Sequence, residues 1–132
     1  MHYGKHLLVE VITKNPKSLT NKNLIKKVFE KISQAIKIIP VLAPVIYQFP
    51  KKRGMPKNIA GGLTAFCIIA ESHLAIHTWP ESNYFAFDLF SCKDFEEKIV
   101  IRILKKHFAI KKLASQIIKR GIDVNFRDSD PI

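Results

Sequence analysis

The sequence predicts an α+β fold, a two-layer sandwich in which two helices cover one face of a mainly antiparallel sheet. Short apolar stretches bounded by Pro, Gly and Asn predict several strands. Two further stretches carry apolar residues at helical spacing. These elements follow the order strand, helix, strands, helix, strand. The length of 132 residues, of which 47% are hydrophobic, indicates one domain spanning residues 1–132 with a small core.

The first strand and the first helix come early in the chain. Residues 6–12 are mostly apolar and end at the turn signal Lys-Asn-Pro-Lys, which indicates a strand. Thr20 or Asn21 can cap the helix that follows, because a side-chain oxygen there accepts a hydrogen bond from a free backbone N–H. Lysines occupy one face of this helix. The opposite, apolar face contains Leu24, Val28, Ile32 and Ala35.

Two more strands precede residue 71. Pro40 and Pro44 stand at the start of a β-branched stretch that runs to Phe49. Because proline cannot donate to a strand ladder, this second strand suits the edge of the sheet. Residues 62–70 are almost entirely apolar and predict the third strand. The strongly basic stretch 51–60 connects the two strands.

Residues 73–79 and 84–92 predict a β-hairpin. The turn between them reads Pro-Glu-Ser-Asn, which is rich in turn-forming residues. We expect Trp79 to face Tyr84 across this turn. The same antiparallel register places Cys92 opposite Glu71.

The last third of the chain predicts a helix and a strand. Acidic residues stand near the start of the helix and Lys-Lys-His near its end, an order that suits the helix dipole. Its apolar face contains Phe95, Ile99 and Ile103. Residues 113–118 predict the final strand, and we expect the polar tail 123–132 to be unstructured.

Composition limits the classes of function. Lys and Arg number 22 against 11 Asp and Glu, a formal net charge of +11. The basic residues are spread over many segments without a recognisable nucleic-acid motif, so we expect a solvated basic surface and no nucleic-acid partner. The sequence has no apolar run long enough for a membrane span and starts without signal-peptide features. We therefore expect a cytoplasmic protein with reduced Cys67 and Cys92.

One stretch concentrates the chemically active side chains. Residues 71–81 read Glu-Ser-His-Leu-Ala-Ile-His-Thr-Trp-Pro-Glu, and residues 85–92 read Phe-Ala-Phe-Asp-Leu-Phe-Ser-Cys. Together they resemble the processing and active-site segment of prokaryotic S-adenosylmethionine decarboxylase, a pyruvoyl-dependent family. The resemblance covers most of residues 4–121 and is strongest over 62–92. It implies a self-processing enzyme that removes the carboxylate of S-adenosylmethionine to give the aminopropyl donor for polyamine synthesis.

The resemblance implies that the chain cuts itself between Glu71 and Ser72, into fragments 1–71 and 72–132. Ser72 then becomes the pyruvoyl cofactor, which forms a Schiff base with the substrate amine. A serine hydroxyl needs a base and an oxyanion donor to attack a carbonyl carbon. In the family's pattern His77 is the processing acid/base and Thr64 serves the oxyanion. Cys92 is the proton donor during decarboxylation.

Three further residues are carried over as substrate-binding residues. Glu81 would hydrogen-bond the ribose hydroxyls, Phe49 would stack on adenine and Trp79 would form a second wall. The family also implies a homodimer with shared active sites. Distance favours this: five extended residues span about 17 Å. His77 therefore reaches its own Ser72 only if the strand bends, and we expect it to act on the partner subunit instead.

These residues are also compatible with simpler roles. Ser72 could be an ordinary hydroxyl at a strand end and Cys92 a core residue. His73 and His77 could form a zinc pair, but no further ligands stand at metal spacing, so we expect no metal. Related pyruvoyl enzymes decarboxylate arginine or ornithine, although the basic insertion 51–60 would repel cationic substrates. A non-enzymatic basic binding module is the alternative from another class, and it would bind nucleic acid in a salt-sensitive way.

Overall fold

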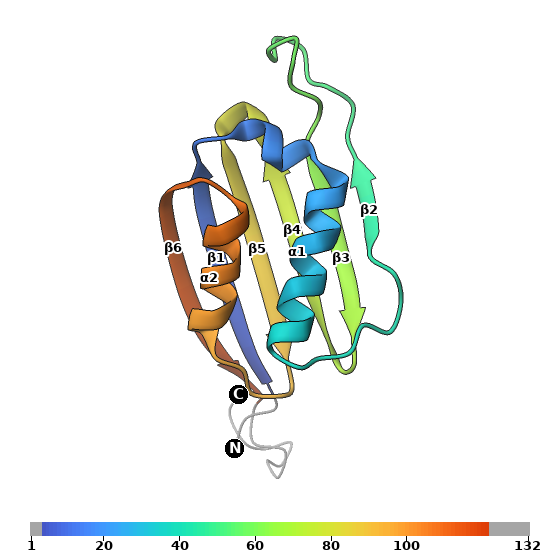
Figure 1. The fold of residues 1–132 in the computed structure, drawn as a ribbon, viewed down its shortest axis with the longest axis vertical. Coiled ribbons are helices and arrows are strands. Elements are labelled where there is room, and N and C mark those ends of the chain that lie inside the picture. The colour runs from blue at the N-terminus through green and yellow to red at the C-terminus, as the bar shows by residue number, and fades with distance from the viewer. Residues whose placement is uncertain (1–3, 122–132) are drawn as a thin grey trace, which may run out of the picture.

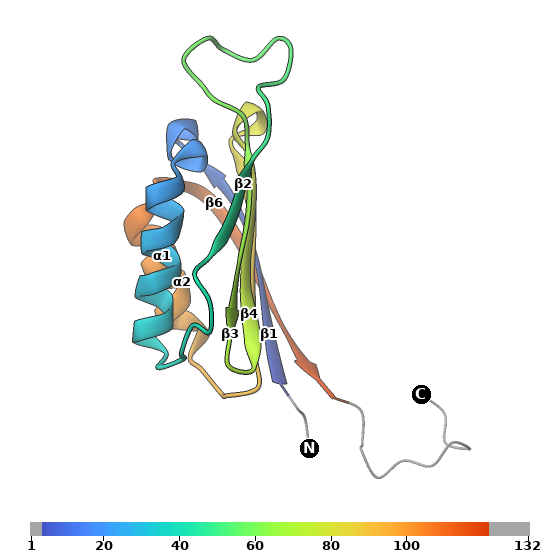
Figure 2. The ribbon, with the colours of Figure 1, turned by 90° about the vertical axis from the view of Figure 1, so that its right-hand side faces the viewer.

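The fold is a six-stranded antiparallel sheet with two helices packed on one face (Figures 1 and 2). A computed structural model describes residues 4–121. The strands are β1 (Gly4–Thr13), β2 (Val45–Gln48), β3 (Leu63–Ile69), β4 (Ser72–Trp79), β5 (Tyr84–Ser91) and β6 (Ile110–Arg120). The helices are α1 (Lys22–Ala35) and α2 (Glu97–His107), with short 3₁₀ turns η1 (Pro16–Thr20) and η2 (Pro80–Ser82). The predicted α+β sandwich is confirmed.

The strand order across the sheet is β2-β3-β4-β5-β1-β6, and every neighbouring pair is antiparallel. β2 lies at one edge, as predicted, but it is shorter than the predicted stretch and starts only after Pro44. At the other edge β6 is longer than the predicted 113–118, because its pairing with β1 continues through Arg120. The two central strands β4 and β5 run along the middle of the molecule (Figure 1).

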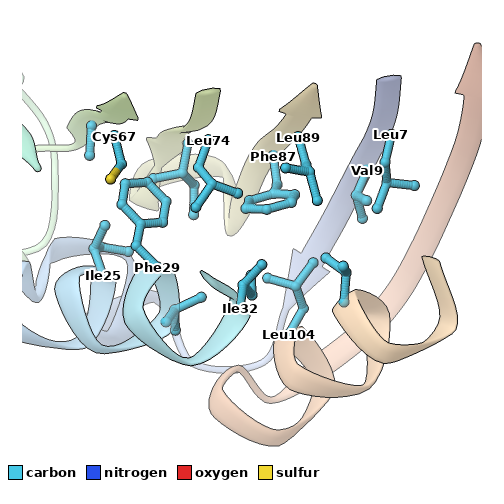
Figure 3. Close-up of a cluster of buried hydrophobic side chains, with 14 of the residues drawn as sticks. Leu7, Val9, Ile25, Phe29, Ile32, Cys67, Leu74, Phe87, Leu89 and Leu104 are labelled. Atoms are coloured by element: carbon cyan, nitrogen blue, oxygen red, sulfur yellow. The ribbon is translucent and has the colours of Figure 1, made fainter. Parts of the chain in front are cut away.

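The core lies between the helices and the sheet (Figure 3). Alternate strand residues point toward the helices, so β1, β3, β4 and β5 each contribute one buried row to the core, whereas the edge strands β2 and β6 add only partly buried residues. Phe29 and Ile32 of α1 and Leu104 of α2 pack onto these rows and are fully buried. Figure 3 shows them facing labelled strand residues such as Leu74 and Phe87.

Asn21 caps α1, since its side-chain oxygen accepts a hydrogen bond from the backbone N–H of Leu24 at 3.1 Å. The predicted apolar face is wrong at Ala35, which is exposed, while Ile36 just beyond the helix is buried. Phe95 is buried but precedes α2, so it lies outside the helix that was predicted to include it.

The predicted hairpin is formed by β4 and β5. Trp79 lies opposite Tyr84, as expected, and Ser72 lies opposite Ser91 at the other end of the ladder. η2 makes the turn together with Asn83, whose left-handed φ of 53° asparagine tolerates well. The hairpin keeps one register over its whole length.

The sheet face turned away from the helices carries nothing in the described part of the chain (Figure 2), and we call it the outer face. Six large apolar residues on it are between 40% and 57% exposed. The strand registers assign them to this face together with Thr64 and His77. They are Val45, Tyr47, Phe66, Ile68, Trp79 and Ile118. An exposed apolar surface of this kind is typical of a protein interface.

The basic connection 51–60 forms an irregular loop between β2 and β3 that projects beyond the end of the sheet (Figures 1 and 2). The predicted unstructured tail 123–132 lies outside the described residues. Within residues 4–121 no helix is long and apolar enough to cross a membrane.

Candidate active site

The candidate site residues form two clusters at opposite ends of β4. One cluster surrounds the Glu71–Ser72 bond in the turn between β3 and β4. The other lies where β3 begins and β4 ends, beneath the loop 51–60. Because β4 is continuous from Ser72 to Trp79 and stays paired with both neighbours, the chain does not bend between Ser72 and His77. One subunit therefore does not bring these two residues together.

In the first cluster Cys92 lies beside the bond that links Glu71 to Ser72. Its thiol is 3.3 Å from the carbonyl oxygen of Glu71, and its backbone N–H donates to the Ser72 hydroxyl oxygen at 2.9 Å. The Ser72 hydroxyl also contacts the Glu71 carbonyl oxygen. Glu71 and Cys92 are exposed. The hydroxyl, the thiol and the carbonyl group thus meet at one exposed turn.

In the second cluster a hydroxyl and an imidazole are in contact. Thr64 and His77 are register partners on β3 and β4, and Thr64 Oγ1 lies 3.2 Å from His77 Nδ1. Both side chains are half-buried and lie on the outer face. A hydroxyl held against an imidazole in this way suits proton transfer.

Thr64 and His77 line a cavity of about 230 Å³ that also contains all three predicted substrate-binding residues. Phe49 and Trp79 are 49% and 40% exposed, so part of each residue is accessible to a ligand. Glu81 is the acidic residue in the lining. The complete lining is Phe49, Pro50, Lys52, Gly62, Thr64, His77, Thr78, Trp79 and Glu81.

Part of the cavity lining depends on a close approach between Gly62, just before β3, and Thr78 near the end of β4. A Cβ atom at Gly62 would lie 2.3 Å from the carbonyl oxygen of Thr78, so only glycine fits there. The buried Thr78 hydroxyl donates to the carbonyl of Leu19 at 2.7 Å and accepts from the N–H of Leu63 at 2.8 Å. These bonds fix the strand ends that carry Thr64 and Trp79, and Glu81 follows in η2.

Lys52 is a lining residue that no motif in the sequence indicated. Its ammonium nitrogen lies 3.3 Å from Oε1 of Glu81 and forms an ion pair with it. Lys52 belongs to the basic insertion, whose irregular path gives no periodicity from which a long-range contact could be predicted. The composition of the insertion was the only signal available for it.

A third group of polar residues lies on the outer face beside the first cluster, since His73 directly follows Ser72 in β4. Nε2 of His6 is 3.1 Å from Oδ1 of Asp88, and the His73 ring lies 6.2 Å from the His6 ring. Burial lowers the pKa of His73, the neighbouring His6 ring lowers it further, Asp88 opposes this effect, and Arg120 adds a smaller lowering. Residues 4–121 contain no group of three or more potential ligands that could hold a metal ion.

Similarity to known protein families decides between an enzyme and a simpler role. The family model described as S-adenosylmethionine decarboxylase matches residues 5–121. The chain belongs to the S-adenosylmethionine decarboxylase family. The match includes both clusters, the cavity and the whole of the described fold except Gly4.

Individual relatives of this decarboxylase family agree over nearly the full chain. The S-adenosylmethionine decarboxylase proenzyme of Clostridium botulinum strain Langeland is 32% identical over 119 residues, covering 89% of this chain and 94% of the relative. The proenzyme of the same name from Clostridium kluyveri is 33% identical over 120 residues, covering 90% and 87%. The similarity therefore extends well beyond the active-site motif.

A solved structure shares the fold. The crystal structure of the adenosylmethionine decarboxylase from Aquifex aeolicus VF5 superimposes with a TM-score of 0.75 at 20% sequence identity, covering 96% of this chain and 98% of that one. At this identity the likeness supports the decarboxylase fold rather than the position of any side chain.

Proposed function

We propose that this chain is a proenzyme that cuts itself between Glu71 and Ser72 and then decarboxylates S-adenosylmethionine. Membership of the family and the names of the relatives support the activity. The observation that carries the proposal for this chain is the meeting of the Ser72 hydroxyl, the Cys92 thiol and the Glu71 carbonyl at one exposed turn.

Self-cleavage follows from the chemistry of these groups. Oγ of Ser72 attacks the carbonyl carbon of Glu71, the C–N bond breaks and an ester replaces the amide. Removal of the Cα proton of Ser72 then breaks the Cβ–Oγ bond, so Glu71 leaves as a new C-terminal carboxylate. Water hydrolyses the remaining dehydroalanine with loss of ammonia, which leaves a pyruvoyl group at residue 72. A base is needed for both proton removals, and His77 fills that role in this proposal.

The residues around Ser72 fit a pyruvoyl group. In that group the ketone would stand at the former Cα of Ser72 and the Cβ would be a methyl group, so the Cys92 N–H, which donates to the Ser72 hydroxyl at 2.9 Å before cleavage, would be released to donate to a bound substrate. When present, the group supplies a carbonyl that withdraws electrons from the substrate during loss of carbon dioxide. Cys92 returns the proton to the former α-carbon, since its thiol is the exposed donor beside this position.

Substrate binding is assigned to the cavity at the other end of β4. Phe49 and Trp79 offer exposed aromatic rings for the adenine, and Glu81 accepts hydrogen bonds from the ribose hydroxyls. The ion pair between Lys52 and Glu81 argues against arginine or ornithine as the substrate, because it neutralises the only carboxylate that lines the cavity within residues 4–121.

The two clusters belong to one active site only if two subunits share it. A second copy can pack on the outer face, related to the first by a two-fold axis that runs perpendicular to the strands near Ala75. This packing would place the His77 end of the second copy beside the Ser72 end of the first copy. The exposed apolar residues of the outer face support such packing, because water would leave their surface. We therefore assign Thr64 and His77 of one subunit to the Glu71–Ser72 bond of its partner.

Release of labelled carbon dioxide tests the activity directly. Purified protein is incubated separately with carboxyl-labelled S-adenosylmethionine, arginine and ornithine, with Ser72→Ala as the matched control. We expect release from S-adenosylmethionine alone, and none from the control. Release from arginine or ornithine instead would overturn the substrate assignment. An inactive, uncut wild-type chain that binds nucleic acid in a salt-sensitive way would favour the binding module.

A further inference from the structure

We infer that Lys52 is a second diol-binding residue of the nucleoside cavity and acts together with Glu81. The inference rests on the proposed function, since it takes the ligand of this cavity to be a nucleoside. Lys52 reaches the cavity from the insertion 51–60, whereas Glu81 comes from the β4–β5 turn, so the two residues meet from different parts of the chain. Their ion pair measures 3.3 Å.

The two side chains offer complementary hydrogen-bonding groups. The Lys52 ammonium has three N–H donors and uses one on Oε1 of Glu81. Oε2 of Glu81 makes no hydrogen bond to any other side chain within the described residues. A vicinal diol can therefore donate from one hydroxyl to Oε2 while its neighbouring hydroxyl oxygen accepts from the ammonium. A carboxylate alone could only accept.

Two hydrogen bonds hold together the two ends of the loop that carries Lys52. The N–H of Phe49 donates to the carbonyl of Gly62 at 2.8 Å, and the Gln48 amide donates to the carbonyl of Gly61 at 3.1 Å. Lys52 is only three residues beyond Phe49, so the anchoring limits where its backbone can lie. Its side chain is 62% exposed, which leaves the ammonium open to a ligand.

The opposite charges of Lys52 and Glu81 favour an uncharged ligand group beside this pair. The glutamate of the pair is 24% exposed and its charge is balanced by Lys52. A cationic amine would have to displace the lysine in order to reach the carboxylate, whereas a ribose diol binds to both groups as they stand. Lys52 thus contributes to the preference for a nucleoside over a free amine.

Calorimetric binding of adenosine, 2′-deoxyadenosine and 3′-deoxyadenosine tests the inference without measuring turnover. Lys52→Met removes the charge at similar length, Lys52→Arg keeps a donor, and Lys51→Met makes the same charge change at the exposed neighbour. We expect Lys52→Met to weaken the binding of adenosine about tenfold, as for loss of a hydrogen bond to a charged group. The deoxynucleoside that lacks the hydroxyl bound by Lys52 should be affected little. Lys52→Arg should retain most of the preference for ribose, and Lys51→Met all of it.

Two results would overturn the inference. One is an equal loss of affinity for all three nucleosides in Lys52→Met, which would mean that Lys52 only supports the loop. The other is unchanged affinity for all three. Failure of the proposed function is distinguishable, because wild-type protein would then bind none of the nucleosides and release no carbon dioxide from S-adenosylmethionine.

Discussion

The thiol of Cys92 lies 3.3 Å from the carbonyl oxygen of Glu71, although 21 residues separate the two in the chain. The β4–β5 hairpin produces this contact, because its register pairs Ser91 with Ser72. Cys92 is the next residue after Ser91 and therefore lies beside Glu71. The residue assigned to proton return therefore stands beside the bond that is assigned to cleavage. In the proposed mechanism, processing and turnover use the same turn but need different side chains.

The two reactions should separate in Cys92→Ala. Self-cleavage needs the Ser72 hydroxyl and a base, so the variant should still be cut, because alanine also keeps the backbone N–H that bonds Ser72. Decarboxylation should lose most of its rate, because the proton donor is gone. Gel analysis measures cleavage and labelled carbon dioxide measures turnover. Cys67→Ala, which alters the buried thiol, is the control. Full activity in Cys92→Ala would remove Cys92 from the mechanism.

Glu81→Gln tests ribose recognition. The amide keeps the size of the side chain but loses the charge-assisted hydrogen bond, which is worth roughly 1.5–3 kcal/mol. KM for S-adenosylmethionine should rise by a factor of about ten to one hundred and fifty at that energy. Cleavage between Glu71 and Ser72 should proceed as in the wild type, which serves as the internal control. An unchanged KM would mean that Glu81 does not hold the ribose.

Co-expression of two inactive chains tests the shared site. Ser72→Ala cannot form pyruvoyl and His77→Ala should form it poorly. In a mixed dimer the Ser72→Ala chain supplies an intact His77 to the Ser72 of its partner. We expect cleavage of the His77→Ala chain only, with at most half the normal activity per dimer.

The control for that experiment is co-expression of His77→Ala with the double variant Ser72→Ala/His77→Ala, which supplies no intact histidine. If His77 acts within its own chain, neither mixture contains a complete site and both should remain uncut. Such a result, with heterodimers confirmed by mass, would refute the exchange of His77 between subunits.

The cluster around His73 predicts a dependence of stability on pH. The folded state lowers the pKa of this imidazole from its ordinary value of 6.5, so the unfolded chain takes up the proton more readily. The stability from neutral His73 is complete above that ordinary value and is lost as the pH falls through it toward the folded-state pKa. His73→Gln should therefore reduce the loss of Tm on acidification.

This measurement is best made in the Ser72→Ala background, where the chain stays in one piece. Thermal unfolding is followed on both sides of the ordinary pKa, and His107→Gln serves as the control because His107 lies on α2, away from the cluster. If His73→Gln and its parent lose the same Tm on acidification, the lowered pKa of His73 does not contribute to stability.

The hairpin and its register were predictable because a single turn signal between two strands fixes every pair along them. The position of Cys92 beside Glu71 followed from that register. The start of α2 was less predictable, because Phe95 is apolar and correctly spaced yet packs into the core from the segment before the helix. Periodicity does not distinguish a buried residue in a helix from one just outside it.

The pairing of Lys52 with Glu81 could not be predicted, since 29 residues separate them and the loop between β2 and β3 is irregular. The exposed apolar residues of the outer face could not be predicted from the sequence either. Phe66 and Ile68 look like core residues within an apolar strand, and only the observed layers reveal that they are 41% and 42% exposed. The distance between Ser72 and His77, in contrast, followed from strand geometry alone.

The intact mass of purified wild-type protein tests the central claim most directly. We predict two fragments, residues 1–71 and residues 72–132, with the second lighter by one ammonia than simple hydrolysis before Ser72 would give and resistant to Edman degradation. Ser72→Ala should remain a single chain of 132 residues. A wild-type chain that stays whole after prolonged incubation would contradict self-processing at Glu71–Ser72.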